Sequence, residues 1–367
     1  MKIAIYEVSC SNHAVMIYNW VEICKKNDWD FEIFTTKDIY KQVSSDIEVV
    51  DGQLHLLKKI SLVEVIKATV NLRKCDVIVI TSLQSYFLHY LPLLFLRSKF
   101  LLTIHNLNTW FVGKDFSSFK GIVKYVVRRL FLKKIKALTV NSENMKKYLD
   151  DKQFTSKLVS IVPFSLRQQS SCSLIANKNT QALNIVYPGM VSKKRKCYKD
   201  FLMLAKKNPD ITFTLLGRLI IKEGGDEIEA EINDNNLKNV VYYKAFVEQE
   251  EFDKVMNSAS ALFSVVNVDY NHQGITEVYG ETKDSGISYL MAEFAVPLIV
   301  NSDFCNFSCL NQGTFYFNNS VELDDIISRF KSSNDFLKEI TNKILKSRTS
   351  LNINNVAREI SGMIEKI

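Results

Sequence analysis

The sequence has no uninterrupted run of eighteen apolar residues, the length that a membrane-spanning helix requires. The nearest run, residues 86–96, is broken by His89 and Pro92. Residues 1–7 form a short apolar run with a charge at each side, which predicts a first buried strand rather than an export segment. We therefore expect a cytoplasmic protein.

Paired cysteine motifs are also missing. Seven cysteines are scattered along the chain: Cys10, Cys24, Cys75, Cys172, Cys197, Cys305 and Cys309. The last two are four positions apart, but no nearby histidine or second pair completes a zinc site. The one Asp-x-Asp sequence, residues 28–30, falls in an expected turn between a helix and a strand. We expect reduced structural thiols and neither a metal nor another cofactor.

The chain is too long, at 367 residues, for one compact core of ordinary size, so two domains are expected. Its 47% hydrophobic and 24% charged residues are typical of a globular protein. Charge is uneven: residues 1–165 contain 24 Lys and Arg against 15 Asp and Glu, a net of +9, and residues 166–367 contain 23 against 25, a net of −2. The first half therefore carries the positive field.

The positive charge is concentrated in residues 120–136, where apolar residues recur at helical spacing between cations. No acidic residue occurs between Asp115 and Glu143. One interpretation is a packed helix with a solvated basic face. The other is docking on an anionic membrane surface, which would place the protein peripherally at the inner face of the plasma membrane. Nucleic acid is not expected, because no recognition motif accompanies the basic residues.

Strand-like and helix-like segments alternate along both halves, which predicts parallel sheets covered on both faces. In the first half, strands are expected at residues 2–8, 31–35, 77–81, 100–104, 137–141 and 158–162, with helices at 13–26, 62–73 and 143–149. In the second half, strands are expected at residues 183–187, 211–216, 240–243 and 261–266, with helices at 198–207, 248–258 and near 323–329, 333–346 and 354–366.

Residues 165–181 are polar and lack hydrophobic periodicity, which is typical of a linker. We therefore expect a first domain at residues 1–165, a linker at 166–181 and a second domain at 182–345. Residues 346–367 would form a terminal helix, for which a return toward the first domain is a further hypothesis. In such open α/β sheets, ligands bind beyond the carboxyl ends of the strands.

Residues 279–300 predict a polar loop, a helix and then a buried strand. Backbone N–H groups after Asp284 or Ser285 would lack intrahelical acceptors, and Gly286 leaves room for a ligand to approach the main chain. The segment is therefore either an ordinary capped helix or an anion site suited to a phosphate.

Several segments, taken in order, resemble retaining glycosyltransferases of family 4. They are residues 187–198 (YPGMVSKKRKCY), 211–218 (ITFTLLGR), 284–300 (DSGISYLMAEFAVPLIV), 102–106 (LTIHN) and 140–149 (VNSENMKKYL). The resemblance implies an α/β protein of the GT-B fold, with two facing Rossmann-like domains, parallel sheets and an interdomain cleft. It further implies a nucleotide-sugar donor in the second domain and an acceptor in the first.

The resemblance also implies a set of donor-binding residues, from which this sequence departs at two glutamates. The alignment fixed by Pro297 places Thr282 and Leu290 at those positions. Diphosphate contacts would then come from the backbone of Ser285 and Gly286. The expected donor set is Gly189, Arg195, Lys196, Gly217, Arg218, Glu281, Thr282, Asp284, Ser285, Gly286 and Glu293.

Some roles within this set stay open. Glu293 is either a ribose contact or a surface residue, and Glu281 could act locally for the missing glutamate. Arg195 is the first candidate for the diphosphate cation, because a guanidinium can bind it bidentately, and Lys196 is the second.

In the first domain, the resemblance implies that His105 lies at the sugar, and we predict it as the catalytic residue, although a structural histidine is the alternative. The loop after the first strand lacks the usual glycine pair, so Ser11, Asn12 and His13 would form the acceptor side.

These features together predict a glycosyltransferase of the hexosyltransferase type that acts on a glycan or lipid-linked glycan in surface polysaccharide biosynthesis. The alternatives are an inactive GT-B partner subunit or carbohydrate-binding protein, and a nucleotide-sugar epimerase of the same fold.

Overall fold

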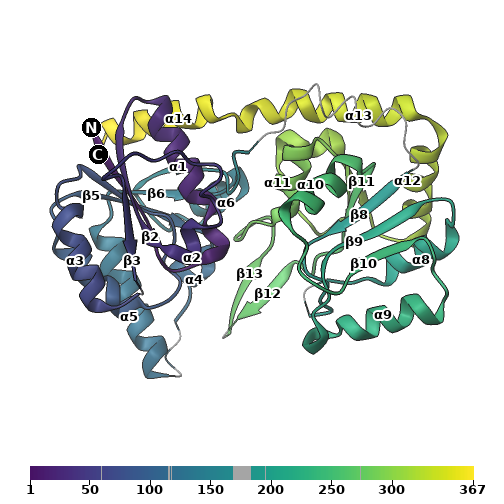
Figure 1. Cartoon of the computed structure of the whole chain (residues 1–367), viewed down its shortest axis with the longest axis horizontal. Coiled ribbons are helices and arrows are strands. Elements are labelled where there is room, and N and C mark those ends of the chain that lie inside the picture. The colour runs from purple at the N-terminus through teal and green to yellow at the C-terminus, as the bar shows by residue number, and fades with distance from the viewer. Residues whose placement is uncertain (59, 115, 117, 168–182, 195, 273) are drawn as a thin grey trace. The chain divides into compact units, whose positions relative to one another are not determined.

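The computed structural model describes residues 1–367 except 59, 115, 117, 168–182, 195 and 273 (Figure 1). The chain separates into two compact units. The first contains Met1–Leu166, Tyr270–Asp284 and Leu351–Ile367, and the second contains Arg167–Asp269 and Ser285–Ser350. The sequence did not predict that residues 270–284 would group with the first unit.

A seven-stranded parallel sheet forms the centre of the first unit, in the order β3-β2-β1-β4-β5-β6-β7. Its strands are β1 (Lys2–Glu7), β2 (Asp30–Thr36), β3 (Leu54–Leu57), β4 (Val77–Ile80), β5 (Lys99–Ile104), β6 (Ala137–Val140) and β7 (Leu158–Ile161). Its helices are α1 (Val15–Lys26), α2 (Lys37–Tyr40), α3 (Leu62–Leu72), α4 (Leu107–Phe111), α5 (Phe119–Lys134), α6 (Glu143–Asp151) and α14 (Ile353–Glu365), with 3₁₀ segments η1 (Ser11–His13) and η2 (Phe87–Phe95).

The central strands of this sheet are buried on both faces, which is why β4 is the unbroken apolar run Val77–Ile80. One face packs against α3, η2 and α5, and the other against α1 and α14. Within the second layer, Asn27 Nδ2 at the end of α1 donates to the Ala357 carbonyl of α14 at 3.1 Å. The carboxyl-terminal helix is therefore part of the first unit's core.

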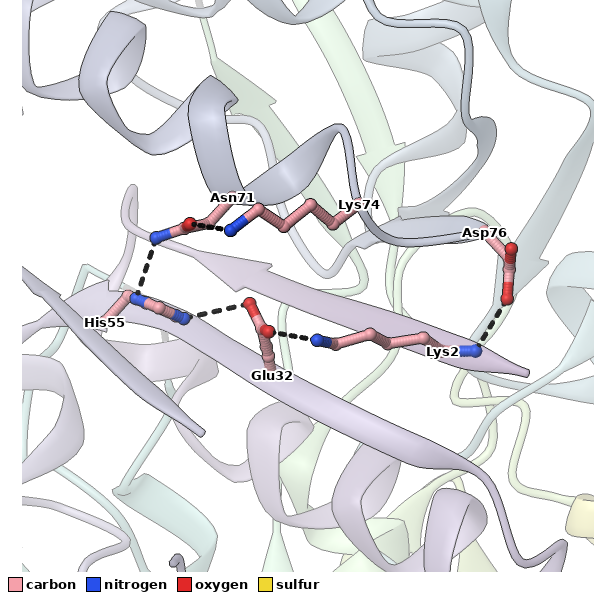
Figure 2. Close-up of polar contacts among 6 residues, drawn as sticks. All are labelled: Lys2, Glu32, His55, Asn71, Lys74 and Asp76. Atoms are coloured by element: carbon pink, nitrogen blue, oxygen red, sulfur yellow. Dashed lines mark hydrogen bonds and ion pairs between the residues drawn. The ribbon is translucent and has the colours of Figure 1, made fainter. Parts of the chain in front are cut away.

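A polar chain lies at the amino-terminal ends of the first strands, at the sheet edge opposite the loops described below (Figure 2). It runs through Asp76, Lys2, Glu32, His55, Asn71 and Lys74. The buried Glu32 carboxylate contacts the Lys2 ammonium at 2.5 Å and the His55 ring at 2.9 Å. These partners offset the cost of burying that carboxylate, so the chain is a structural element.

The second unit contains a six-stranded parallel sheet in the order β10-β9-β8-β11-β14-β15. Its strands are β8 (Asn184–Pro188), β9 (Thr212–Arg218), β10 (Val240–Tyr243), β11 (Ala261–Ser264), β14 (Leu298–Asn301) and β15 (Thr314–Phe317). Its helices are α8 (Lys199–Lys207), α9 (Gly225–Asp234), α10 (Gln249–Ser258), α11 (Gly286–Phe294), α12 (Ser320–Ser332) and α13 (Asn334–Ser347), with 3₁₀ segments η3 (Ile221–Glu223), η4 (Ser308–Gly313) and η5 (Arg348–Leu351).

The strand order of each sheet reverses at one position, between β1 and β4 in the first unit and between β8 and β11 in the second. Loops after two such strands diverge to opposite faces and leave a ligand-sized crevice at the carboxyl edge. The candidate site residues are therefore sought in the loops after these strands. The two parallel sheets confirm the predicted α/β class.

Candidate functional site

The carboxyl edge of the second unit's sheet is shaped by two glycines. Gly189, directly after β8, has a φ of +91°, which side chains other than glycine rarely tolerate. A Cβ on Gly217, in β9, would lie 2.5 Å from backbone atoms of Gly189. The two strand ends can approach this closely only because Gly217 lacks a side chain, whereas Gly189 is needed for its positive φ.

Lys196 brings a cation to the same turn. Its ammonium lies 3.1 Å from the position that a Cβ of Gly189 would occupy and donates to the Pro188 carbonyl. It also lies 4.7 Å from the centroid of the Tyr187 ring, a favourable cation–π distance. Lys196 is thus held at the end of β8, and its contact with a donor diphosphate stays a prediction.

The other predicted cations differ in their settings. Lys193 pairs with Glu227 of α9 at 2.7 Å, and the Arg218 side chain is exposed at the end of β9. Arg195, the first candidate from sequence, lies outside the described residues. Among the cations that the structure describes in this loop, Lys196 is the one placed over the glycine turn.

Helix α11 begins where the sequence predicted, with Ser285 as its N-cap. The Ser285 hydroxyl accepts from the Ile287 N–H at 3.5 Å. A Cβ on Gly286 would meet no heavy atom within 4 Å, so the space beside the first turn is open. The unpaired N–H groups of this turn and the helix dipole favour an anion there.

Glu293 lies near the opposite end of α11, seven residues after Gly286 and so about 10 Å along the helix axis. There the Arg348 guanidinium donates to the Ala292 and Glu293 carbonyls, both at 3.0 Å. Burial lowers the pKa of Arg348, and the charge of Glu293 partly opposes this shift. A ribose contact by Glu293 stays a prediction.

Residues 269–284 form a strap that belongs almost entirely to the first unit. It contains the hairpin β12 (Asp269–His272) and β13 (Ile275–Val278), followed by the loop to Asp284. The Glu277 carboxylate, 2% exposed, accepts from the N–H of Asn108 at 3.2 Å and from the N–H and hydroxyl of Thr109, each at 2.7 Å. It also accepts from the Thr282 hydroxyl at 2.7 Å. Glu277 was not predicted from the sequence, since its partners Asn108 and Thr109 lie about 170 positions earlier in the chain.

The strap divides the predicted donor set between the two units. Thr282 is buried and its hydroxyl is committed to Glu277, whereas Glu281 is exposed. The Asp284 carboxylate accepts from the Ser142 hydroxyl at 2.6 Å. Thr282 and Asp284 therefore have structural partners in the first unit, and the chain returns to the second unit at Ser285.

A second unpredicted carboxylate, that of Glu7, lies at the switch point of the first sheet. It is fully buried at the end of β1 and accepts from the N–H groups of Ser9 (2.8 Å) and Cys10 (3.1 Å). The hydroxyls of Thr81 and Ser82, after β4, donate to it at 2.7 and 2.5 Å. Burial raises the pKa of Glu7, although these donors pull it down. Glu7 fixes both switch-point loops to each other.

The rings of His13 and His105 are in contact, with centroids 4.0 Å apart and ring planes tilted by 39°. His105, after β5 as predicted, has Nδ1 2.6 Å from Asn141 Oδ1 and Nε2 2.8 Å from the Thr81 carbonyl. Burial lowers the pKa of His105 to about 4 despite these contacts. Both His105 nitrogens face acceptor oxygens of the protein, and a neutral ring can donate its single N–H to only one of them.

His13 is the less satisfied ring of the pair. Its Nε2 lies 3.4 Å from Gln84 Nε2, and its buried Nδ1 has no hydrogen-bond partner among the described residues. Burial, with smaller contributions from His105 and Lys283, lowers the pKa of His13 to about 2. Ser11 and Asn12 are exposed beside it in η1. His13 is thus a neutral ring at pH 7 with one buried nitrogen that has no hydrogen-bond partner among the described residues.

Within the described residues, no group of three or more His, Cys, Asp and Glu side chains could hold a metal ion. No helix of the described chain is long and apolar enough to cross a membrane.

The fold matches several solved structures over the whole chain, although neither a family model nor a curated protein matches the sequence. Sucrose-phosphate synthase (tll1590) from Thermosynechococcus elongatus is 14% identical, with a TM-score of 0.66, and the match covers 100% of this chain and 98% of that one. Anabaena Alr3699/HepE in complex with UDP is 12% identical, with a TM-score of 0.70 and full coverage of both chains. UDP-GlcNAc 2-epimerase from Neisseria meningitidis, bound to UDP-GlcNAc, is 13% identical, with a TM-score of 0.63 and full coverage.

Together with the two parallel sheets, these matches define the class of this protein: it has the GT-B fold, as the sequence resemblance implied.

Proposed function

We propose that this protein is a glycosyltransferase that moves a sugar from a nucleoside-diphosphate donor to a glycan or lipid-linked glycan acceptor, with retention and without a metal. The supporting observation is that one edge of the second sheet carries both the Lys196 cation at the Gly189 turn and the open first turn of α11 at Gly286. Structures with this fold have been solved with UDP, and with UDP-glucose.

The proposed chemistry follows from charge. Cleaving the sugar–phosphate bond places negative charge on the departing diphosphate, and fixed donors lower that barrier. Lys196 and the backbone N–H groups after Ser285 supply such donors, and Arg195 and Arg218 are further candidates. The ribose would be held without the usual second glutamate, since Leu290 stands at that position.

The acceptor would bind to the first unit, near Ser11, Asn12 and His13, with His105 positioning the His13 ring through their ring contact. The basic helix α5 suggests an acceptor at an anionic membrane surface, as in surface polysaccharide assembly at the inner face of the plasma membrane.

A thermal-shift screen against UDP-, GDP-, ADP- and TDP-sugars tests the donor assignment. A ligand at a hundred times its Kd stabilises the folded protein by about 2.7 kcal/mol. Lys196→Gln should weaken binding of the stabilising donor. Lys238→Gln removes the same charge from the loop before β10 and should leave donor binding unchanged. Equal weakening by both variants, or no stabilising donor at all, would refute the assignment.

An epimerase acting on the nucleotide sugar is the second candidate, because two UDP-GlcNAc 2-epimerase structures also match the whole chain. Incubation with UDP-GlcNAc in the absence of an acceptor separates the two. An epimerised nucleotide sugar identifies the epimerase, whereas transfer only when an acceptor is added identifies the transferase. If a donor binds but neither reaction occurs, the protein is an inactive partner. That outcome would agree with the absence of the usual glutamates, whose positions are occupied by Thr282 and Leu290.

A further inference from the structure

A pocket of about 530 Å³ lies between η2 and α5 in the first unit. Its lining residues include Tyr86, His89, Phe119, Lys120, Val123 and Lys124. None of the residues that form its wall in the described chain carries a carboxylate. The pocket is therefore cationic and aromatic, and it is large enough for a phosphorylated sugar or a similar head group.

The wall contributed by η2 carries local costs that the fold tolerates. Tyr86 adopts a left-handed backbone conformation, with φ 57° and ψ 34°, although it is not glycine. Its ring stacks on the His89 ring at 5.7 Å, and the buried Nδ1 of His89 has no hydrogen-bond partner within the described part of the chain. Strain and unsatisfied polar atoms of this kind cost about 1–3 kcal/mol each and cluster at ligand sites.

The α5 wall combines charge with an exposed apolar face. Lys120 and Lys124, one helical turn apart, both line the pocket. Phe119 is 81% exposed, and Ile122, Val126 and Leu130 follow it at spacings of three, four and four residues, all on one exposed face. Since Phe119 belongs to both the pocket and this face, a cationic pocket suited to an anion continues directly into an apolar surface.

The pocket also adjoins the candidate acceptor site. Gln84 lines the pocket, and its amide nitrogen lies 3.4 Å from His13 Nε2. A ligand head seated against η2 would thus lie next to the loop that follows β4.

We propose that this pocket binds the phosphate-bearing head of an amphiphilic acceptor, with Lys120 and Lys124 contacting the phosphate and the Phe119 face contacting the lipid chain. Two lysines suit a phosphate, and an exposed stripe of four apolar residues suits an alkyl chain better than water. The term acceptor rests on the proposed function, whereas the binding of a phosphorylated amphiphile does not.

Dodecyl phosphate, used below its critical micelle concentration, is the probe for calorimetric titration of the full chain. Dodecyl maltoside supplies the same chain without charge, and inorganic phosphate supplies the charge without the chain. We expect saturable binding of dodecyl phosphate, at least tenfold tighter than that of either comparison compound.

Lys120→Gln with Lys124→Gln should weaken dodecyl phosphate binding at least tenfold. The matched pair Lys133→Gln with Lys136→Gln, which removes the same charge outside the pocket lining, should change it less than twofold. A third variant, Phe119→Ser, should reduce the preference for dodecyl phosphate over inorganic phosphate.

Three results overturn the proposal: equal affinity for dodecyl maltoside, equal affinity for inorganic phosphate, or equal weakening by the two lysine pairs. A further outcome is that dodecyl phosphate does not bind, that vesicles rich in phosphatidylglycerol do bind the protein, and that the two double-lysine variants weaken vesicle binding equally. In that case the surface is a general membrane contact and the pocket proposal fails. Donor stabilisation measured on the same variants reports on the proposed function separately, because it depends on residues of the second unit.

Discussion

Replacing His13 with phenylalanine should make the first unit less sensitive to acid. His13 is 9% exposed and its ring contacts that of His105, and burial lowers its pKa from 6.5 to about 2. Its folded-state pKa lies below its unfolded value, so between these two pKa values the unfolded chain binds a proton at His13 and the folded chain does not. The stabilisation due to neutral His13 is therefore fully present above pH 6.5 and is lost as the pH falls below that value.

The magnitude follows from proton linkage. Between pH 7.5 and pH 5, an unfolded histidine with a pKa of 6.5 gains about 2 kcal/mol from protonation, while the buried ring gains almost nothing. The result depends only on the folded pKa lying well below 5. His105, with a pKa lowered to about 4, adds a further loss of about 2 kcal/mol over the same range. Between pH 7.5 and pH 5, the wild-type protein should thus lose about twice as much unfolding free energy through these histidines as the His13→Phe variant.

Tryptophan fluorescence during urea unfolding measures the relevant unit, because all three tryptophans, Trp20, Trp29 and Trp110, belong to it. The raised pKa of Glu7 acts in the opposite direction, since stability from a raised carboxyl pKa is lost as the pH rises. Glu7 is present in both proteins and cancels in their difference. The stability of His13→Phe relative to wild type should therefore rise by about 2 kcal/mol from pH 7.5 to pH 5. A difference constant within about 0.5 kcal/mol would refute the burial argument.

Three further predictions concern the strap and the second unit. Glu277→Gln should destabilise the first unit by about 2 kcal/mol in the same fluorescence assay, because it replaces charge-assisted hydrogen bonds from four donors with those of a neutral amide; a change below about 0.5 kcal/mol would contradict this. Gly217→Ala should lower the stability of the second unit by about 1–3 kcal/mol, because the new Cβ would lie 2.5 Å from backbone atoms. The control Gly286→Ala places a Cβ with no heavy atom within 4 Å and should cost clearly less. Circular dichroism measures both variants. Lys196→Gln should weaken donor binding by about 1.5–3 kcal/mol in calorimetry, and an unchanged affinity, or an equal loss in Lys238→Gln, would exclude Lys196 as a diphosphate contact.

Local patterns in the sequence predicted most of the central strands. Strands such as β1, β4 and β5 are buried on both faces and are therefore continuous apolar runs, which are visible without a structure. The Ser142 and Ser285 caps were recognisable because an N-cap acts within three residues of itself. The short edge strands β3 and β15 and the hairpin β12–β13 were missed, since these strands are partly exposed and mix polar with apolar residues, so they form no continuous apolar run.

The sequence by itself determined the α/β class, the GT-B resemblance and the position of α11, because all three depend on the order and period of neighbouring residues. Only the tertiary structure showed that Glu277 holds a strap to residues 108 and 109, that Glu7 joins two loops, and that the rings of His13 and His105 are in contact. Each of these contacts joins residues separated by roughly 70 to 170 positions, and such pairs leave no local signal. Burial, which no single segment reveals, then shifts the pKa values of Glu7, His13 and His105.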